Sequence, residues 1–111
     1  MIEATVIGYL TGALTVPVSA ELPAELPASF VVVEKTGGGE ANYIRDATIA
    51  VQSYAPTLFE AAQLNETVLT AMAGLVALPS ISKCTLNTSY NFTDPSTKQY
   101  RYQAVFDITH Y

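Results

Sequence analysis

Phe30–Gly39 (FVVVEKTGGG) and Ala47–Tyr54 (ATIAVQSY) are the two segments that decide the fold of this chain. The first begins with apolar, mostly β-branched residues, which are typical of a buried strand. The second alternates along its length, as a half-buried strand does. Thr36–Gly39, between them, is dominated by glycine and predicts a loop. The two segments together predict a β-hairpin with a long, glycine-rich tip.

A long helix is expected directly after this hairpin. Pro56 ends the second strand, because proline has no N–H for the ladder. Thr57 and Glu60 have the spacing of a capping box, which marks the start of a helix. Apolar residues then recur at helical spacing, so one face of the helix should cover the hairpin. These residues are Leu58, Ala61, Ala62, Leu64, Val68, Met72, Leu75 and Val76.

The residues before the hairpin predict a short helix, an edge strand and a connector. Apolar residues at helical spacing over the first dozen positions predict a helix that ends near Gly12. Thr15–Ser19 predicts a strand at a sheet edge, because Pro17 lacks a ladder donor. Glu21–Ala28 repeats the tetrapeptide Glu-Leu-Pro-Ala, which predicts a stiff, extended connector within one domain.

A second hairpin is expected at the end of the chain, with its turn at 93–97. Its alternating pattern gives four apolar pairs on one face, which are Cys84 with Ile108, Leu86 with Phe106, Tyr90 with Tyr102 and Phe92 with Tyr100. The opposite face is mostly polar and faces solvent or another subunit. The predicted fold is therefore α+β, a single domain over residues 1–111. Its elements follow the order α-β-β-β-α-β-β, and both helices pack on one face of a mostly antiparallel sheet.

Composition limits the classes of function. The chain has 111 residues, half of them hydrophobic, which is enough for a core without disulfides or metal. Ten acidic residues against five basic ones give a net charge of −5, which argues against binding to nucleic acid or to anionic membranes. The longest apolar run, Ala71–Leu78, is far below the roughly 20 residues of a membrane span. With Cys84 as its single cysteine, the chain is expected to be intracellular and without a zinc site.

The sequence gives no basis for a catalytic site. Gly37–Gly39 lacks the Lys-Ser/Thr pair and the following helix of a phosphate-binding loop. His110 lies one residue from the end of the sequence and is expected to be a surface histidine. Strand alternation sends Lys83 away from Cys84, so the thiol is expected to be a small buried apolar group. We therefore expect no enzymatic activity, no catalytic residue, no cofactor and no metal.

The order of segments along the chain is similar to that of a known family. The segments that carry this similarity are the N-terminal helix, Val16–Val18, the two Leu-Pro pairs of the connector, Phe30–Gly38, Asp46–Ala55 and Glu60–Leu64. The chain resembles the small tail-completion (tail-terminator) proteins of long-tailed bacteriophages and prophages, also described as minor capsid or head-tail joining proteins. The most specific features are the basic-x-Gly-Gly sequence at Lys35–Gly38, the acidic Asp46 that opens the next strand, and the alanine-rich helix.

The resemblance implies a structural protein without catalysis or cofactor. Such proteins have an α+β fold and form a hexameric ring that caps the tail tube, stops its growth and presents the docking surface for the head-neck connector. The implied partners are other copies of the chain, the tail tube protein and the head-neck connector protein. DNA would pass through the ring without specific binding, and an acidic chain suits such a conduit because it repels DNA. The implied location is the tail-neck junction of the virion, after synthesis in the cytoplasm of the bacterial host, with no membrane involved.

The candidate contact between subunits is the glycine-rich loop and the start of the next strand. Its residues are Lys35, Gly37, Gly38, Tyr43, Arg45 and Asp46. In the family the basic residue of this loop is commonly arginine, so Lys35 would make a weaker contact with a neighbouring carboxylate. Pairing of Lys35 with Asp46 within one chain is the alternative.

Two other functions remain open from the sequence. The first is another neck or tail component, such as a head-closure or tube protein. The second is a small cytoplasmic ligand-binding or enzymatic α+β domain with a pocket between helix and sheet. A pocket predicts stabilisation by a ligand, whereas a ring predicts self-association without one.

Overall fold

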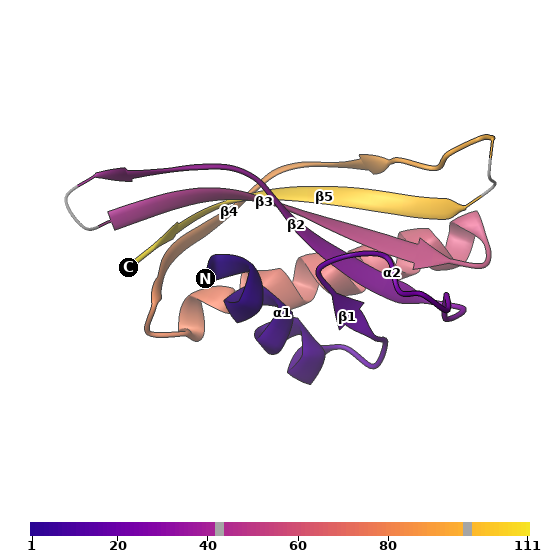
Figure 1. Ribbon diagram of the computed structural model, residues 1–111, viewed down its shortest axis with the longest axis horizontal. Helices are drawn as coiled ribbons and strands as arrows, with labels where there is room; N and C mark the ends of the chain where they lie inside the picture. Colours follow the sequence, from indigo (N-terminus) through magenta and orange to yellow (C-terminus); the bar gives the residue numbers. More distant parts are fainter. Residues whose placement is uncertain (42–43, 97–98) are drawn as a thin grey trace.

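The strands form one sheet, and both helices pack against the same face of it (Figure 1). The computed structural model describes residues 1–41, 44–96 and 99–111. In this part of the chain the elements are α1 (Ile2–Ala13), β1 (Val18–Ser19), β2 (Phe30–Ala41), β3 (Ile44–Ala55), α2 (Leu58–Ala73), the short 3-10 helix η1 (Leu75–Ala77), β4 (Ile81–Asn91) and β5 (Tyr100–His110). The α+β class and the predicted order of elements are confirmed.

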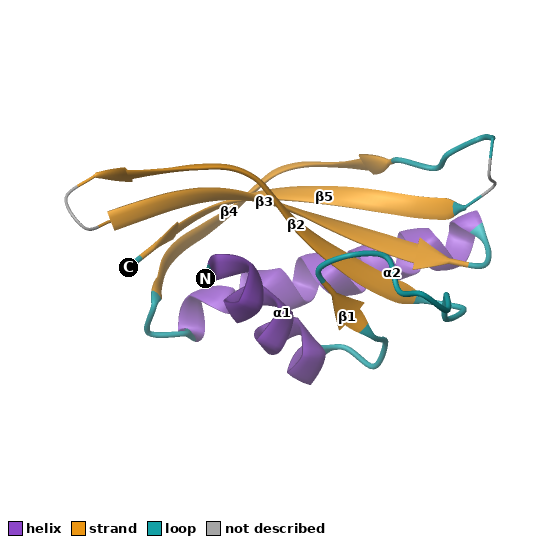
Figure 2. Cartoon of the chain, in the orientation of Figure 1, coloured by secondary structure: helices purple, strands orange, loops and turns teal. Residues whose placement is uncertain are grey.

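The strand order across the sheet is β1-β2-β3-β5-β4 (Figure 2). β1 runs parallel to β2, and the other described neighbours pair antiparallel, so the sheet is mixed. β1 is an edge strand, as Pro17 predicts. The connector after it, however, bends at Ala24–Glu25 and again at Ala28–Ser29, so the prediction of an extended segment is wrong. Two parallel strands start from the same end, so the chain must turn back between them.

The start of α2 is formed as the sequence predicts. The Thr57 hydroxyl accepts a hydrogen bond from the backbone N–H of Glu60 at 3.2 Å, which caps the helix. The predicted positions Ala61, Val68 and Met72 are buried against the sheet. Leu58 in the first turn and Val76 in η1 are 40% and 47% exposed, so these two do not belong to the buried face.

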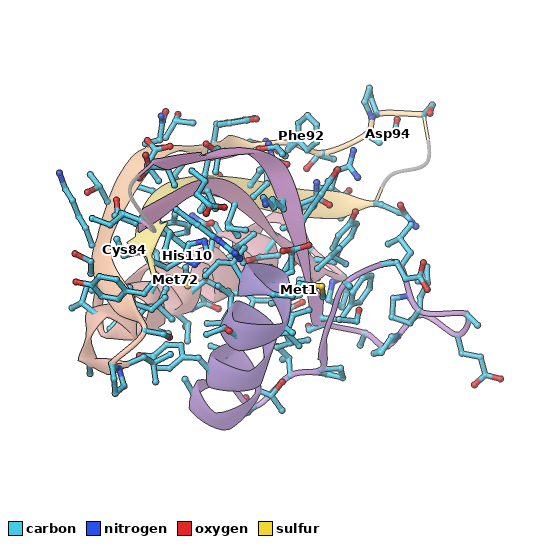
Figure 3. The ribbon with its side chains drawn as sticks, turned by 60° about the vertical axis from the view of Figure 1, so that its left-hand side comes forward. Met1, Met72, Cys84, Phe92, Asp94 and His110 are labelled. Atoms are coloured by element: carbon cyan, nitrogen blue, oxygen red, sulfur yellow. The ribbon has the colours of Figure 1, made fainter. Side chains whose placement is uncertain are left out.

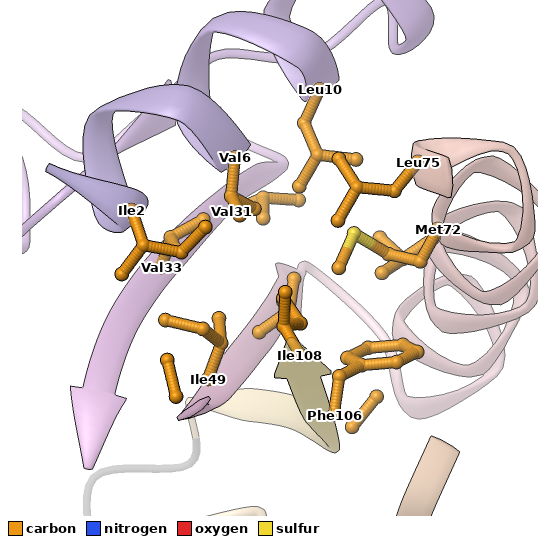
Figure 4. Packing of buried hydrophobic residues seen from close by; sticks show 14 of the residues in the cluster. Ile2, Val6, Leu10, Val31, Val33, Ile49, Met72, Leu75, Phe106 and Ile108 are labelled. Carbon is orange, nitrogen blue, oxygen red and sulfur yellow. The ribbon is translucent and has the colours of Figure 1, made fainter. Parts of the chain in front are cut away.

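Apolar side chains from both helices and the sheet fill the layer between them (Figure 4). The members of this cluster that are at most 3% exposed include Val6, Leu10, Val31, Val33, Ile49, Met72, Leu75, Phe106 and Ile108. Burying one such side chain contributes roughly 1.5–3 kcal/mol. The Tyr9 hydroxyl donates to the Ala71 carbonyl at 2.7 Å and ties α1 to α2. A Cβ at Gly74 would lie 2.6 Å from that hydroxyl, which explains the glycine.

The glycines predicted to form a loop belong to β2, so that prediction is wrong. Gly37, Gly38 and Gly39 pair with Thr48, Ala47 and Asp46 of β3, and a β-bulge lies between Lys35 and Gly37. None of the three has a left-handed φ angle, so their backbone can continue the strand. The ladder to β3 overrides the weak strand propensity of glycine, and the bulge takes up one extra residue.

The register of the second hairpin is partly as predicted. Cys84 pairs with Ile108 and Leu86 with Phe106. A bulge between Leu86 and Thr88 then shifts the ladder by one residue, so Tyr90 pairs with Gln103 and not with Tyr102. The same shift overturns the predicted pairing of Phe92 with Tyr100. A single inserted residue sends every following side chain to the opposite face.

Candidate assembly surface

The last part of β2 and the first residues of β3 form a projecting hairpin that we call the arm, defined as the described residues Glu34–Ala41 and Ile44–Asp46. Residues 34–40 and 44–46 are all exposed, whereas the preceding Val31 and Val33 are buried. β5 ends at His110, opposite Arg45, and Figure 1 shows β2 and β3 continuing beyond that point. The arm is thus ordered β-structure that buries little of its surface within the chain.

Three charged residues of the arm lie on the helix-covered side of the sheet. Lys35 pairs in the ladder with Ile49, and paired residues lie on the same face of the sheet. Because Ile49 is buried beneath the helices, Lys35 lies on the helix-covered side. Lys35, Glu40, Arg45 and His110 line a hollow that the first turn of α1 also borders. Arg45 Nε lies 3.3 Å from Glu40 Oε2, and both side chains are more than half exposed. Such an exposed pair contributes little to stability.

Asp46 lies on the opposite, uncovered side. Its carboxylate Oδ1 accepts a hydrogen bond from the Thr109 hydroxyl at 3.0 Å. Nearby, Asp107 accepts hydrogen bonds from the Thr48 hydroxyl at 3.2 Å and from Asn87 Nδ2 at 2.9 Å. The alternative pairing of Lys35 with Asp46 is therefore not formed between these described residues, because the two side chains lie on different faces.

The three glycines of the arm differ in what a side chain would meet. A Cβ at Gly38 would lie 2.8 Å from the backbone oxygen of Asp46 and 2.9 Å from Lys35 Cε. At Gly37 the nearest atoms, in Thr48, are 3.9 Å away, and Gly39 has nothing within 4 Å. Contacts within the chain therefore explain the glycine only at position 38. Tyr43, also predicted for this contact, lies outside the described residues.

The two residues that the sequence analysis considers for catalysis, His110 and Cys84, both lie within strands of the sheet. His110 is 8% exposed and pairs in the ladder with Arg45 and Ile81, so the prediction of a surface histidine is wrong. Strands on both sides hold this end of β5 in place. Burial raises the pKa of Cys84 to about 11, so its thiol stays protonated at neutral pH. Within the described ranges, no group of three or more His, Cys, Asp or Glu side chains is placed to hold a metal ion.

A second surface is a groove between α2 and β4, whose residues the sequence analysis does not predict. Leu69, Met72 and Ala73 of α2, Cys84 and Leu86 of β4, and Phe106 of β5 line it. Figure 3 labels Met72 and Cys84, which come from the two walls of this groove. β4 is the last strand of the sheet, and Leu86 is 45% exposed at its edge. Apolar alternation indicates a buried strand face but does not reveal which strand lies at an edge.

At the other end of the sheet, Arg101 and Tyr54 of the uncovered face are hydrogen-bonded within the chain. Arg101 donates from Nη1 to the Tyr54 hydroxyl at 2.8 Å and from Nε to the Phe92 carbonyl at 2.7 Å. Its guanidinium also lies 4.4 Å from the centroid of the Phe92 ring. Tyr54 stacks on Phe30 with ring centroids 4.5 Å apart. Arg101 therefore fixes the start of β5 and is not offered to a partner.

No protein-family model matches the chain, and no curated protein sequence matches it either. Neither helix of the described segments is both long and apolar enough to cross a lipid bilayer. The resemblance to tail-completion proteins stays a prediction, and the arm and the groove are the surfaces on which its assembly can be tested.

Proposed function

We infer that this protein is a structural virion protein that forms a ring on the end of a phage tail tube. The ring ends tube growth and provides the docking surface for the head-neck connector. The resemblance described above suggests this function, and one observation supports self-assembly: the arm is ordered β-structure whose residues at 34–40 and 44–46 are exposed in the single chain.

The physical argument concerns the cost of ordering the arm. Fixing the backbone of one residue costs roughly 1–2 kcal/mol, which buried apolar surface normally offsets. A ribbon of two strands without a covered face is only marginally stable in water. In the described ladder β5 ends opposite Arg45, so the Ala41–Ile44 pair lies beyond it in such a ribbon. A neighbouring subunit that covers the arm would supply the missing burial.

The open edge of β2 favours contact with another backbone. In the described ladder, β1 pairs with β2 at Val31 and Val32, so β1 does not cover the edge of the arm. Gly37 and Gly39 also leave that edge without side chains. Unpaired N–H and C=O groups at a sheet edge readily bind another chain.

The positions of the two edges favour a ring over a two-fold dimer. The arm belongs to the β1–β2 side of the sheet, and β4 forms the opposite edge. Contact between two different surfaces is heterologous, and it closes into a ring when the rotation between subunits allows. The number of six subunits comes from the resemblance. The tube protein and the head-neck connector protein would bind the two faces of the ring. The net charge of −5 would keep DNA from adhering to its bore.

The rival function, a ligand-binding domain, receives less support from the packing. It requires an open pocket between the helices and the sheet. Side chains less than 2% exposed fill most of this layer, among them Leu10, Ile49, Met72, Leu75 and Ile108. The groove between α2 and β4 at its margin has a volume of about 140 Å³, which is below the roughly 300 Å³ of a typical ligand pocket.

The test is the absolute mass in solution, measured by light scattering on a size-exclusion column, with negative-stain images of the largest species. We expect a hexamer with a central hole, either free or on purified tail tubes that lack a terminator. Gly39→Val should abolish the ring without unfolding the chain, whereas Gly8→Val, at an exposed helical glycine with similar room, should leave it intact. A chain that stays monomeric at every concentration and does not bind tubes overturns the proposal.

Tube-growth experiments separate a terminator from other tail components. Polymerisation of tube protein is followed by electron microscopy with and without this protein. A terminator shortens the tubes and is found only at their ends. Incorporation along the tube wall would instead identify a tube protein and would contradict a capping role.

A further inference from the structure

We propose that the arm of one copy pairs with the open edge of β4 in the next copy, so that the sheet continues from subunit to subunit. This contact rests on the proposed function, since it joins subunits of the ring, and it names the strand that the arm binds. The ladder between the copies is antiparallel, with Glu40 opposite Cys84 and Lys35 opposite Ser89 of the next copy.

β4 has a long backbone edge that its own chain leaves unpaired. It is the last strand of the described sheet and pairs on one side only, with β5. All its residues after Ile81 are exposed except the half-buried Cys84. Lys83 is its single charged residue, and it contains no proline. Charges and prolines are the usual means by which a sheet edge excludes other strands, so this edge is open to pairing.

The direction of the strands fits this contact. In the series β2, β3, β5 and β4, each strand runs antiparallel to the one before it, so β4 runs antiparallel to β2. A second copy placed beside the arm, with its helices on the same side of the sheet, presents β4 as its nearest strand. The ladder then crosses the subunit boundary in the antiparallel direction. The contact is heterologous, as a ring requires.

One irregularity that β2 and β4 share restricts their register. A bulge inserts Thr36 into β2, and another inserts Asn87 into β4. Each inserted residue reverses which of the following side chains lie on the helix-covered face. A strand with one bulge therefore matches its neighbour face to face on both sides of the bulge only when the neighbour has a bulge at the same place. Placing Thr36 beside Asn87 gives this match.

β1 limits how far the second copy can slide along the arm. β1 pairs with β2 at residues 31 and 32, so β4 of the next copy has an open edge only from Val33 onward. With Asn91, the last residue of β4, opposite Val33, the ladder extends to Lys83 opposite Ala41, the last residue of β2. The two bulges lie side by side in this register. β4 thus fills the part of the β2 edge that β1 leaves unpaired.

The residue pairs that this register creates are compatible. The pairs on the helix-covered side are Lys35 with Ser89, Gly38 with Leu86 and Glu40 with Cys84. None of the pairs joins two like charges, which would destabilise the ladder. Gly37 and Gly39 lie in the middle of the contact, and glycine inside a strand is typical of a close approach by another backbone.

A disulfide between copies tests the register, because Cys84 is the single cysteine of the chain. Glu40→Cys, at a position whose side chain is 56% exposed, places a second thiol opposite Cys84 of the next copy. The protein is oxidised in air with copper phenanthroline at pH 9, because burial raises the pKa of Cys84 to about 11. We expect covalent oligomers up to the size of the ring on a non-reducing gel.

Two further variants control for random collision. Lys35→Cys lies on the same face of the arm but roughly 16 Å along the strand from position 40, so it should not form oligomers through Cys84. Glu40→Cys with Cys84→Ser should give little product. Equal yields of oligomer from Lys35→Cys and Glu40→Cys overturn the inference. A strong dimer from the variant with Cys84→Ser also overturns it, because it would show two arms in two-fold contact.

Hydrogen exchange of the wild-type chain tests the contact without a substitution. Peptides covering 34–41 and 83–91 should both become protected when the dilute monomer assembles into the ring or caps a tube. Residues 102–106 of β5 are paired on both sides within the chain, so their exchange should not change. A ring in which 83–91 exchanges as fast as in the monomer contradicts the β4 contact and leaves the proposed function standing. A wild-type chain that neither self-associates nor caps tubes contradicts both.

Discussion

The helix-covered half of the β2–β3 hairpin and the arm use the same ladder but differ in burial. Val31, Val33, Ile49 and Val51 are at most 1% exposed beneath the helices. The strands continue with unbroken pairing into the arm, apart from one bulge, yet residues 34–40 are all exposed. Backbone hydrogen bonds are therefore similar in the two halves, and the covered apolar area is the main difference between them. Substitutions in the two halves should separate folding from assembly.

The largest effect is expected in the covered half. Met72→Ala removes a fully buried side chain and should lower the free energy of unfolding by about 2–5 kcal/mol. Ile44→Ala in the arm, where the side chain is 42% exposed, should lower it by less than about 1 kcal/mol. Urea unfolding followed by circular dichroism measures both values. Similar losses in the two variants would mean that the arm is packed as tightly as the core.

A smaller effect should distinguish two neighbouring glycines within the arm. Gly38→Ala places a Cβ 2.8 Å from the Asp46 carbonyl oxygen, and the strain should cost about 1–3 kcal/mol. Gly39→Ala meets nothing within 4 Å and should gain up to about 1 kcal/mol, because alanine loses less backbone freedom on folding.

Thermal unfolding of the two single variants tests this difference under identical conditions. The expected order of melting temperatures is Gly39→Ala at or above the wild type, with Gly38→Ala below it. A reversed order would mean that the backbone of β2 does not approach Asp46 as described.

Sequence reasoning succeeded where local patterns determine the structure. The helical spacing of Ile2, Val6 and Leu10 identified the buried face of α1, and Thr57 identified the start of α2. It failed at Gly37–Gly39, where pairing with β3 overrides the weak strand propensity of glycine. It also failed at the bulge between Leu86 and Thr88, because one inserted residue leaves no mark in an alternating pattern. The wrong pairing of Tyr90 follows from that bulge alone.

The candidate surfaces depend on information that is not local. Lys35, Arg45 and Asp46 were selected together, but the ladder places Asp46 on the opposite face from Lys35. The groove at Cys84 exists because β4 lies outside β5 in the strand order, and the sequence did not reveal that order. Whether these residues contact a second copy stays a prediction.

The smallest effect on folding is expected at the ion pair of the arm. Glu40→Ala and Arg45→Ala should each change the free energy of unfolding by less than about 0.5 kcal/mol, because both side chains are more than half exposed.

The effects of these two variants on the ring should differ. If the only role of Arg45 is its ion pair with Glu40, the two variants weaken assembly equally, and the double variant weakens it no further. If Arg45 contacts the neighbouring subunit, its removal raises the concentration needed for assembly more than removal of Glu40 does, and added salt reduces the difference. Light scattering over a dilution series of the three variants measures this, and equal midpoints for the two single variants would remove Arg45 from the interface.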